Sequence, residues 1–280
     1  TNIEPSKIHG IGISYQMHGL VLLNKYGEVL RNSIIWCDDR AIDLGNEAYD
    51  KIGPKKCNEN LLNSPGNFTA SKLAWVKNNE PQIYSQIHKF LLPGDFIAYK
   101  LTGDMVSTAN GLSEGMFWDF KEKKVANWLL DYFQIDHSLV PETLENFRDQ
   151  GYVNKKGSEE SGLPVGVPVR YRAGDQPNNA MSLNVLNSGE VAATGGTSGV
   201  LYAITNNIKS KESLRINNFA HVNYNKKNEL IGKLLCLNGA GIQYKWMKNN
   251  TNSGSYFEMN KISSNVKIGS DGLFVYPYGN

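Results

Sequence analysis

The sequence lacks the features that define several classes of protein. It contains no apolar run of about 18 residues or more, so no membrane-spanning helix is predicted. Its three cysteines lie far apart and form no CxxC pair, which predicts reduced thiols in a cytoplasmic protein. The formal net charge is only +2, and no block of Lys and Arg is longer than a pair. Neither nucleic acid nor a membrane surface is therefore expected as a partner. The expected partners are small molecules.

The two common nucleotide-binding signatures are also missing. No Lys follows a glycine-rich loop as in a P-loop, and no GxGxxG opens a helix. Instead, the residues TGGTSG at 194–199 predict a tight turn between two strands. Closely spaced glycines let backbone N–H groups approach an anion, which makes Gly196, Thr197, Ser198 and Gly199 a candidate phosphate site. The alternative is an ordinary hairpin whose glycines merely supply positive φ.

Asp175 is the strongest candidate for a catalytic residue. It follows a strand-like stretch at 168–171 and precedes a segment that could be helical. A carboxylate at the end of a strand stands where α/β sheets gather their ligands. In phosphoryl transfer such a carboxylate accepts the proton of the attacking hydroxyl. The alternative is that Asp175 caps the following helix, since Asp is a favoured N-cap residue.

Two polar segments near the start of the chain are candidate ligand-binding sites. Gln16 and His18 could hydrogen-bond a polyol while Met17 packs on its carbon chain, although an ordinary hydrogen-bonded histidine is the alternative. The residues WCDDR at 36–40 could supply an aromatic wall and an ion pair. They could equally begin a helix, with Asp38 or Asp39 as N-cap and Trp36 in the core.

The order of predicted elements indicates an α/β fold, and the length allows one large domain or two. The patterns predict a hairpin at 20–36, helices at 41–52 and 96–101, a helix with Thr69 as N-cap, short strands and turns at 146–169, and a strand at 272–278. A shift in composition after residue 186 places a domain boundary there. The expected domains are therefore 1–186 and 187–280.

Several motifs together resemble the FGGY family of carbohydrate kinases, and its xylulose kinases in particular. Residues 11–19 and 36–40 are similar to the family's GxSxQMHG and WxDxR segments, and 69–79 to its first signature, with a departure at Asn67. Residues 91–96 and 101–103 resemble the LPxDY and LTG pair. Gly174-Asp175-Gln176 matches the segment of the catalytic base, and 196–199 matches the second phosphate loop.

The resemblance implies an actin-like ATPase fold of two ribonuclease-H-like α/β domains with a cleft between them. The first domain would bind sugar, and the second, beginning at 187, would bind ATP. The implied sites are the base, Asp175; the sugar-binding residues, Gln16, Met17, His18 and Gln176; and the ATP phosphate-binding residues, Gly196, Thr197, Ser198 and Gly199. ATP and Mg²⁺ are implied as cofactors, no residue of the chain is expected to bind metal itself, and a homodimer is an allowed assembly.

The implied reaction is the ATP-dependent phosphorylation of D-xylulose to D-xylulose 5-phosphate. Gln176 stands where many xylulose kinases have Asn and glycerol kinases have Gln, so glycerol, gluconate or a deoxy-ketose remain alternative substrates. A non-catalytic sugar-binding protein on the same scaffold is the third hypothesis. The family's first phosphate loop, DxGT, and its adenine-binding segment are not in this sequence. The chain is therefore expected to be truncated at both ends and inactive by itself.

Overall fold

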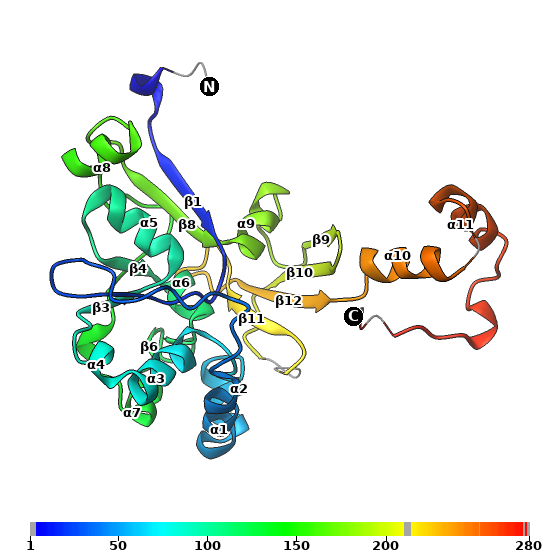
Figure 1. Cartoon of the computed structure of the whole chain (residues 1–280), viewed down its shortest axis with the longest axis horizontal. Coiled ribbons are helices and arrows are strands. Elements are labelled where there is room, and N and C mark those ends of the chain that lie inside the picture. Colours follow the sequence, from blue (N-terminus) through cyan, green and yellow to red (C-terminus); the bar gives the residue numbers. More distant parts are fainter. Residues whose placement is uncertain (1–3, 210–213, 252, 277, 279–280) are drawn as a thin grey trace.

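The computed structural model describes residues 4–209, 214–251, 253–276 and 278. Its first half is organised around two parallel strands, β1 (Ile11–Tyr15) and β8 (Val169–Gly174), which lie side by side in Figure 1. Their register pairs Tyr15 with Gly174, so both strands end at the same edge. Helices α5 (Pro93–Thr102) and α6 (Ala109–Glu114) pack against these strands, and α9 (Asp175–Ser182) begins directly at the end of β8.

The remaining elements of this half surround that centre. Strand pairs form between β2 (Val21–Leu23) and β3 (Lys89–Leu91), β4 (Val106–Thr108) and β7 (Glu142–Leu144), and β5 (Trp118–Asp119) and β6 (Lys124–Val125). The helices are α1 (Ile42–Ile52), α2 (Pro54–Asn60), α3 (Thr69–Asn79), α4 (Pro81–Tyr84), α7 (Asn127–Phe133) and α8 (Lys155–Ser161). Short 3₁₀ turns lie at Pro5–Lys7 and His137–Leu139.

The later part of the chain forms a four-stranded antiparallel sheet in the order β11-β12-β10-β9. Its strands are β9 (Val191–Gly195), β10 (Gly199–Thr205), β11 (Asn217–Ala220) and β12 (Ile231–Leu237). After β12, α10 (Gly241–Asn250) and α11 (Tyr256–Ser263) extend to the right in Figure 1, followed by a 3₁₀ turn at Ser270–Gly272. Neither helix has a buried residue, so the ordered core ends before α10.

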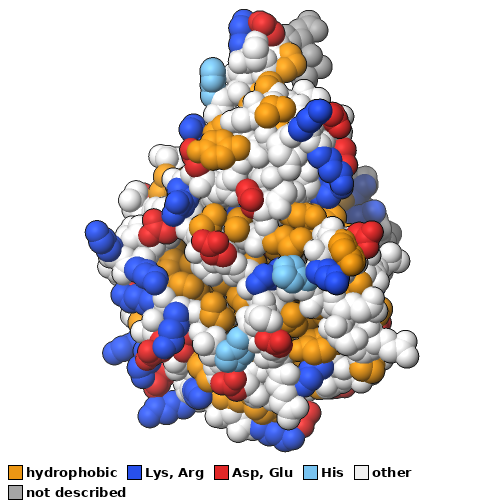
Figure 2. All heavy atoms as spheres, turned by 90° about the vertical axis from the view of Figure 1, so that its left-hand side faces the viewer, with side chains coloured by type: hydrophobic (Ala, Val, Ile, Leu, Met, Phe, Trp, Pro, Cys, Tyr) orange, Lys and Arg blue, Asp and Glu red, His pale blue; other side chains and the backbone are white. Residues whose placement is uncertain are grey.

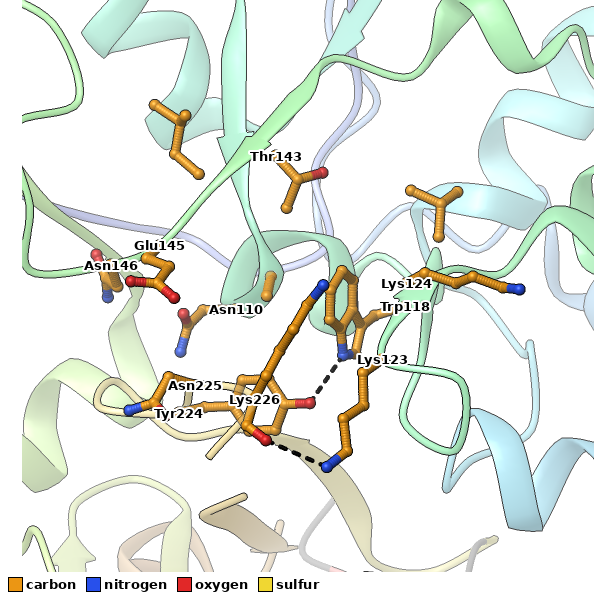
Figure 3. A pocket seen from close by; sticks show the side chains of 13 residues that line it. Asn110, Trp118, Lys123, Lys124, Thr143, Glu145, Asn146, Tyr224, Asn225 and Lys226 are labelled. Atoms are coloured by element: carbon orange, nitrogen blue, oxygen red, sulfur yellow. Dashed lines mark hydrogen bonds between the residues drawn. The ribbon is translucent and has the colours of Figure 1, made fainter. Parts of the chain in front are cut away.

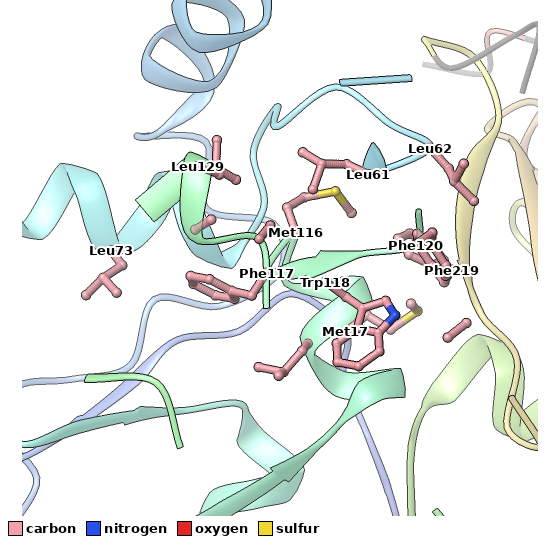
Figure 4. Packing of buried hydrophobic residues seen from close by; sticks show 14 of the residues in the cluster. Met17, Leu61, Leu62, Leu73, Met116, Phe117, Trp118, Phe120, Leu129 and Phe219 are labelled. Atoms are coloured by element: carbon pink, nitrogen blue, oxygen red, sulfur yellow. The ribbon is translucent and has the colours of Figure 1, made fainter. Parts of the chain in front are cut away.

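One hydrophobic cluster connects the two parts. It contains Met17, Phe117 and Trp118 from the first part and Phe219 and Ile231 from the later sheet. Figure 4 shows the aromatic and methionine side chains of this cluster meeting between the elements that carry them. The cluster therefore extends across residue 186, where the sequence predicts a domain boundary, and that boundary stays a prediction.

The surface agrees with the balanced charge of the sequence. On the face shown in Figure 2, acidic and basic side chains are mixed with apolar ones. Among the residues described above, no helix is both long enough and apolar enough to cross a membrane.

Several predicted elements need correction. Helix α1 begins at Ile42 with Ala41 as its N-cap, and Trp36 is 60% exposed, so the segment 36–40 neither caps a helix nor enters the core. Thr69 is the first residue of α3 and its N-cap is Phe68. The hairpin at 20–36 exists, but its second arm pairs only at two isolated bridges.

Two further predictions fail at the surface and at the end of the chain. The segment 146–169 contains α8, which the patterns did not predict, because Asn154 accepts a hydrogen bond from Gly157 N–H and starts a helix of mostly polar residues. The run at 272–278 forms no strand over 273–276, where its apolar side chains are exposed; residue 277 lies outside the described residues.

Candidate active site

The ends of β1 and β8 bring two of the predicted segments together. Parallel strands present their carboxyl ends at one edge, so Gln16 and Asp175 both follow directly from paired residues. Asp175 occupies the first turn of α9, and the N-cap is Gly174. The alternative that Asp175 caps the helix is therefore not what the structure shows. The side chain accepts a hydrogen bond of 3.0 Å from Gln176 Nε2, which orients one carboxylate oxygen.

Gly174 allows a close approach that fixes this edge. A Cβ at this position would lie 2.4 Å from Met17 Cγ and 2.5 Å from Glu114 Oε2. Any larger residue would push β8 away from β1 and α6, and Asp175 would move with it. Met17 itself is only 4% exposed, so its side chain belongs mainly to the core beneath the predicted sugar site.

Glu114, at the end of α6, is a buried carboxyl that the sequence analysis missed. Its side chain hydrogen-bonds Tyr15, and its Oε1 has no hydrogen-bond partner among the described residues. Burial raises the pKa of Glu114 well above its ordinary value, and the nearby negative charges of Asp95 and Asp175 raise it further. Burial therefore favours the protonated form of Glu114 more strongly than at an exposed glutamate.

His18 is held as a neutral ring. Its Nδ1 lies 2.8 Å from the carbonyl oxygen of Glu114, so Nδ1–H donates and Nε2 is left as an acceptor. The ring packs against Phe68 and Phe219 with centroid distances of 4.7 and 5.3 Å. Burial lowers the pKa of His18 to about 4, and the charge of Lys72 acts in the same direction. A neutral Nε2 acceptor suits a ligand hydroxyl.

Lys72 joins the two N-terminal segments that the sequence singled out. Its ammonium donates to the carbonyl oxygens of His18, at 3.0 Å, and of Ile35, at 2.8 Å. Gln16 Oε1 adds a longer contact of 3.4 Å from the backbone N–H of Trp36. Burial lowers the pKa of Lys72 to about 8. The predicted sugar-binding loop is therefore fastened to the segment beside it by a buried cation.

The ion pair expected within 36–40 is present. Arg40 donates through two nitrogens to the two oxygens of Asp38, at 2.8 and 2.7 Å. The guanidinium also lies 4.7 Å from the ring centroid of Trp75. This pair lowers the pKa of Asp38 and raises that of Arg40, so both stay charged over the physiological range.

Behind the site, a second buried ion pair anchors β8. Arg172 donates to Asp95 Oδ1 at 3.0 Å, and its other contacts are the Val106 carbonyl at 2.9 Å and Gln150 Oε1 at 2.8 Å. Both charged side chains are almost completely buried. Because Arg172 lies two residues before Gly174, this network fixes the strand that carries Asp175.

The predicted phosphate loop is the turn between β9 and β10. Gly196 N–H donates to the carbonyl of Ser198 at 2.9 Å, and residues 193–198 are exposed. Gly195, Gly196 and Gly199 do not adopt positive φ, so the interpretation that these glycines serve only turn geometry is not supported. A Cβ at Gly195 would meet nothing within 4 Å, which leaves this backbone open to an approaching group.

The start of α10 holds this hairpin. The N–H groups of Gly241 and Ile242 donate to the carbonyl oxygens of Gly196 and Thr197, at 2.9 and 3.0 Å. A Cβ at Gly241 would lie 2.4 Å from the Gly196 oxygen, so glycine is required for this contact. The hairpin is therefore positioned by two backbone hydrogen bonds rather than by burial.

The later sheet also reaches Asp175. Helix α9 packs against β9 and β10. Burial raises the pKa of the Cys236 thiol on β12, and the charge of Asp175 raises it further, which places Cys236 within the field of that carboxylate. No pattern in the sequence singles out Cys236. An open gap between Asp175 and the hairpin stays a prediction.

The described residues contain no group of three or more His, Cys, Asp or Glu side chains that could hold a metal ion.

Comparison with known protein families decides the relationship. The N-terminal domain of the FGGY family of carbohydrate kinases matches residues 1–182. The chain belongs to the FGGY family of carbohydrate kinases. This confirms the resemblance drawn from the motifs, and the family's members are phosphotransferases that act on carbohydrates.

Individual relatives of this FGGY chain agree. The xylulose kinase of Staphylococcus xylosus is 28% identical over 271 residues, which are 96% of the chain and 55% of the relative. That of Escherichia coli is 28% identical over 76% of the chain and 44% of the relative. The crystal structure of xylulose kinase from Rhodospirillum rubrum is 25% identical with a TM-score of 0.85, covering 96% of this chain and 55% of that one.

The fold is shared more widely than the sequence. Plasmodium falciparum glycerol kinase, with ADP, is only 18% identical, but its TM-score is 0.81 over 95% of this chain and 55% of that one. The expected actin-like ATPase fold is confirmed for the part that this chain contains. The chain spans about half the length of the curated relatives it matches.

Proposed function

We propose that the protein containing this chain phosphorylates a ketose with ATP, with D-xylulose as substrate and D-xylulose 5-phosphate as product. The observation that carries the proposal is the edge where β1 and β8 end. There Asp175 follows directly from β8, beside the buried Glu114 and near the loop that holds a neutral His18. The named xylulose kinases among the relatives support the choice of sugar.

In this reaction Asp175 accepts the proton of the sugar hydroxyl as that oxygen attacks the terminal phosphorus of ATP. Gln176 holds one carboxylate oxygen, and the other is left to face the hydroxyl. His18 Nε2 and the amide of Gln16 bind other hydroxyls of the sugar. Most of the rate acceleration in such transfers comes from holding the reactants in the correct geometry. The anchored β8 strand keeps Asp175 in a fixed position for this purpose.

The hairpin from Gly196 to Gly199 binds the phosphates of ATP through the exposed backbone N–H groups of Thr197 and Ser198 and through their hydroxyls, while Gly196 N–H keeps its hydrogen bond to the Ser198 carbonyl. Mg²⁺ would neutralise phosphate charge and would arrive with ATP, since the described side chains form no metal cluster of their own. The boundary at 186/187, with sugar bound before it and ATP after it, belongs to the same proposal. The substrates are small molecules, and the cytoplasm is the proposed location.

The test measures ADP release by the full-length protein with D-xylulose, glycerol and gluconate in turn. We expect D-xylulose to give the highest kcat/KM, and Asp175→Asn to lower kcat by about 10²- to 10⁴-fold, the usual contribution of a general base. Asp131→Asn is the matched control, because the Asp131 side chain is exposed and, among the described residues, pairs with His137 alone.

Three results would contradict the proposal. Full activity of Asp175→Asn would show that Asp175 is not the base. A higher kcat/KM with glycerol or gluconate would show that the substrate is not D-xylulose, while phosphoryl transfer from ATP would still be the reaction. Absence of ADP release with every sugar would favour the non-catalytic sugar-binding alternative.

A further inference from the structure

A pocket beside the start of α6 is lined by residues other than those of the edge that carries Asp175. It has a volume of about 360 Å³, within the range of small-molecule sites. Its walls come from the start of α6, the β5–β6 pair, β7 and the segment 224–226, as Figure 3 shows. It therefore opens on the contact between the first half of the chain and the later sheet.

The base of this pocket is apolar and rigid. Trp118 donates its indole N–H to the hydroxyl of Tyr224 at 3.1 Å, and both rings are buried. Val125 and Leu144 add partly buried aliphatic surface. This arrangement offers a preformed surface for the carbon skeleton of a ligand, because the two aromatic side chains already satisfy each other's polar atoms.

The rim carries polar groups that the protein leaves unpaired. Lys226 extends its side chain across the pocket in Figure 3, and its ammonium has no ion pair among the described residues. The neighbouring Lys123, by contrast, is paired with Glu229 and donates to the Lys226 carbonyl. Thr143 Oγ1 and Asn225 Nδ2 also line the pocket without a hydrogen bond to a described residue.

Asn110 adds a buried acceptor without a donor. Its Nδ2 donates to the carbonyl oxygens of Ala220 and His221, while its Oδ1 is buried and has no partner. Leaving such an oxygen unsatisfied costs free energy, which a donor brought by a ligand would recover after a small rotation of the amide. Among the described residues, the pocket thus offers one unpaired ammonium, that of Lys226, together with one free hydroxyl, a free amide N–H₂ and a free acceptor around an apolar base, and the carboxylate of Glu145 also lines it.

We propose that this pocket binds a small polyol that carries one anionic group, of the sugar phosphate or sugar acid class. Lys226 pairs with the anionic group, and Thr143, Asn110 and Asn225 bind hydroxyls. Sugar phosphates and sugar acids share this chemistry. The site is separate from the proposed catalytic edge and does not depend on the reaction assigned to it.

The test is isothermal titration of the intact protein with ribose 5-phosphate, gluconate, ribose and inorganic phosphate. We expect ribose 5-phosphate or gluconate to bind with one site per chain and at least about tenfold more tightly than ribose, because the anionic group gains a charged hydrogen bond. The stronger of the two anions identifies the class. Equal binding of ribose, or binding of inorganic phosphate as tight as that of the best ligand, would overturn the proposal.

Variants locate the binding. Lys226→Gln should weaken the best ligand at least about tenfold, whereas Lys227→Gln, an exposed neighbour that does not line the pocket, should leave it unchanged. Thr143→Val, which keeps the side-chain shape, should weaken it by a smaller factor of about two to ten. Unchanged affinity in Lys226→Gln would place the ligand elsewhere, at the catalytic edge for example, and would overturn the proposal.

Discussion

The two halves of the candidate site are built in opposite ways. The edge around Asp175 rests on buried groups: the Arg172–Asp95 ion pair, Glu114, and the contacts of Lys72. The hairpin at 196–198 is exposed and is tied to α10 by two backbone hydrogen bonds. The groups that hold the proposed base are thus embedded, whereas the loop proposed to bind phosphate keeps its backbone exposed. We expect substitutions at the edge to cost more stability than those at the hairpin.

The largest effect is expected from Arg172→Met. This change removes the buried partner of Asp95 and leaves a carboxyl whose pKa burial already raises. Breaking a buried pair from one side costs about 3 to 5 kcal/mol of the free energy of unfolding. Urea denaturation measures it, and Arg170→Met, two residues away on the same strand but in an exposed pair with Asp149, is the control and should change little.

Replacing both partners, Arg172→Met with Asp95→Leu, should recover part of the loss, because no uncompensated buried charge remains. If Arg172→Met lowers the free energy of unfolding no more than Arg170→Met does, the buried ion pair at the edge does not contribute the extra stability expected of it.

A smaller effect concerns the pH dependence of His18. Its pKa is about 4 in the folded protein, below the ordinary value of 6.5. Between these values the unfolded chain binds a proton that the folded protein does not, so the free energy of unfolding falls as pH falls through this window. Between pH 7 and pH 4.5, the titration of His18 lowers the free energy of unfolding by about 2 kcal/mol.

Urea denaturation at several pH values would show this as a steeper acid loss in the wild type than in His18→Gln. His88→Gln, at an exposed position, serves as the control and should follow the wild type. Parallel curves for wild type and His18→Gln would show that the imidazole is not held neutral.

The smallest effect is expected at the hairpin itself. In Gly241→Ala the new methyl group would clash with the carbonyl oxygen of Gly196 and would displace the hairpin from α10. Overpacking of this kind costs about 1 kcal/mol or slightly more. Amide hydrogen exchange should accelerate at Ile242, whose N–H donates to the Thr197 carbonyl. Gly195→Ala, which has open space around it, is the control; equal exchange in both variants would show that α10 does not hold the hairpin.

Local patterns in the sequence were sufficient for the parts of the site that depend on neighbouring residues. The strand-end position of Asp175 and the strand–turn–strand at 194–199 follow from apolar runs and glycines, and the structure contains both. Helix α5 ends at Gly103, as its left-handed conformation requires.

The parts that the sequence could not give depend on contacts between distant residues. Glu114 and Lys72 are polar residues within helices, where exposure is the ordinary expectation, and only the packing of α3 and α6 against the N-terminal loop buries them. Cys236 comes close to Asp175 because β12 pairs with β10, which no local pattern indicates. A core position for Trp36 was one of the two interpretations of residues 36–40, and the side chain is 60% exposed instead.

Helix α6 has a consequence for how this enzyme family could diversify. Asn110 and Glu114 are four residues apart, which is about one turn or about 6 Å along the helix axis. A single helix therefore forms a wall of the pocket that contains Lys226 and also supplies the carbonyl that sets the tautomer of His18. A mutation that shifts the start of this helix would also shift the carbonyl at its end. Under the proposed function, a change at the start of α6 would therefore alter the sugar site without contacting the sugar.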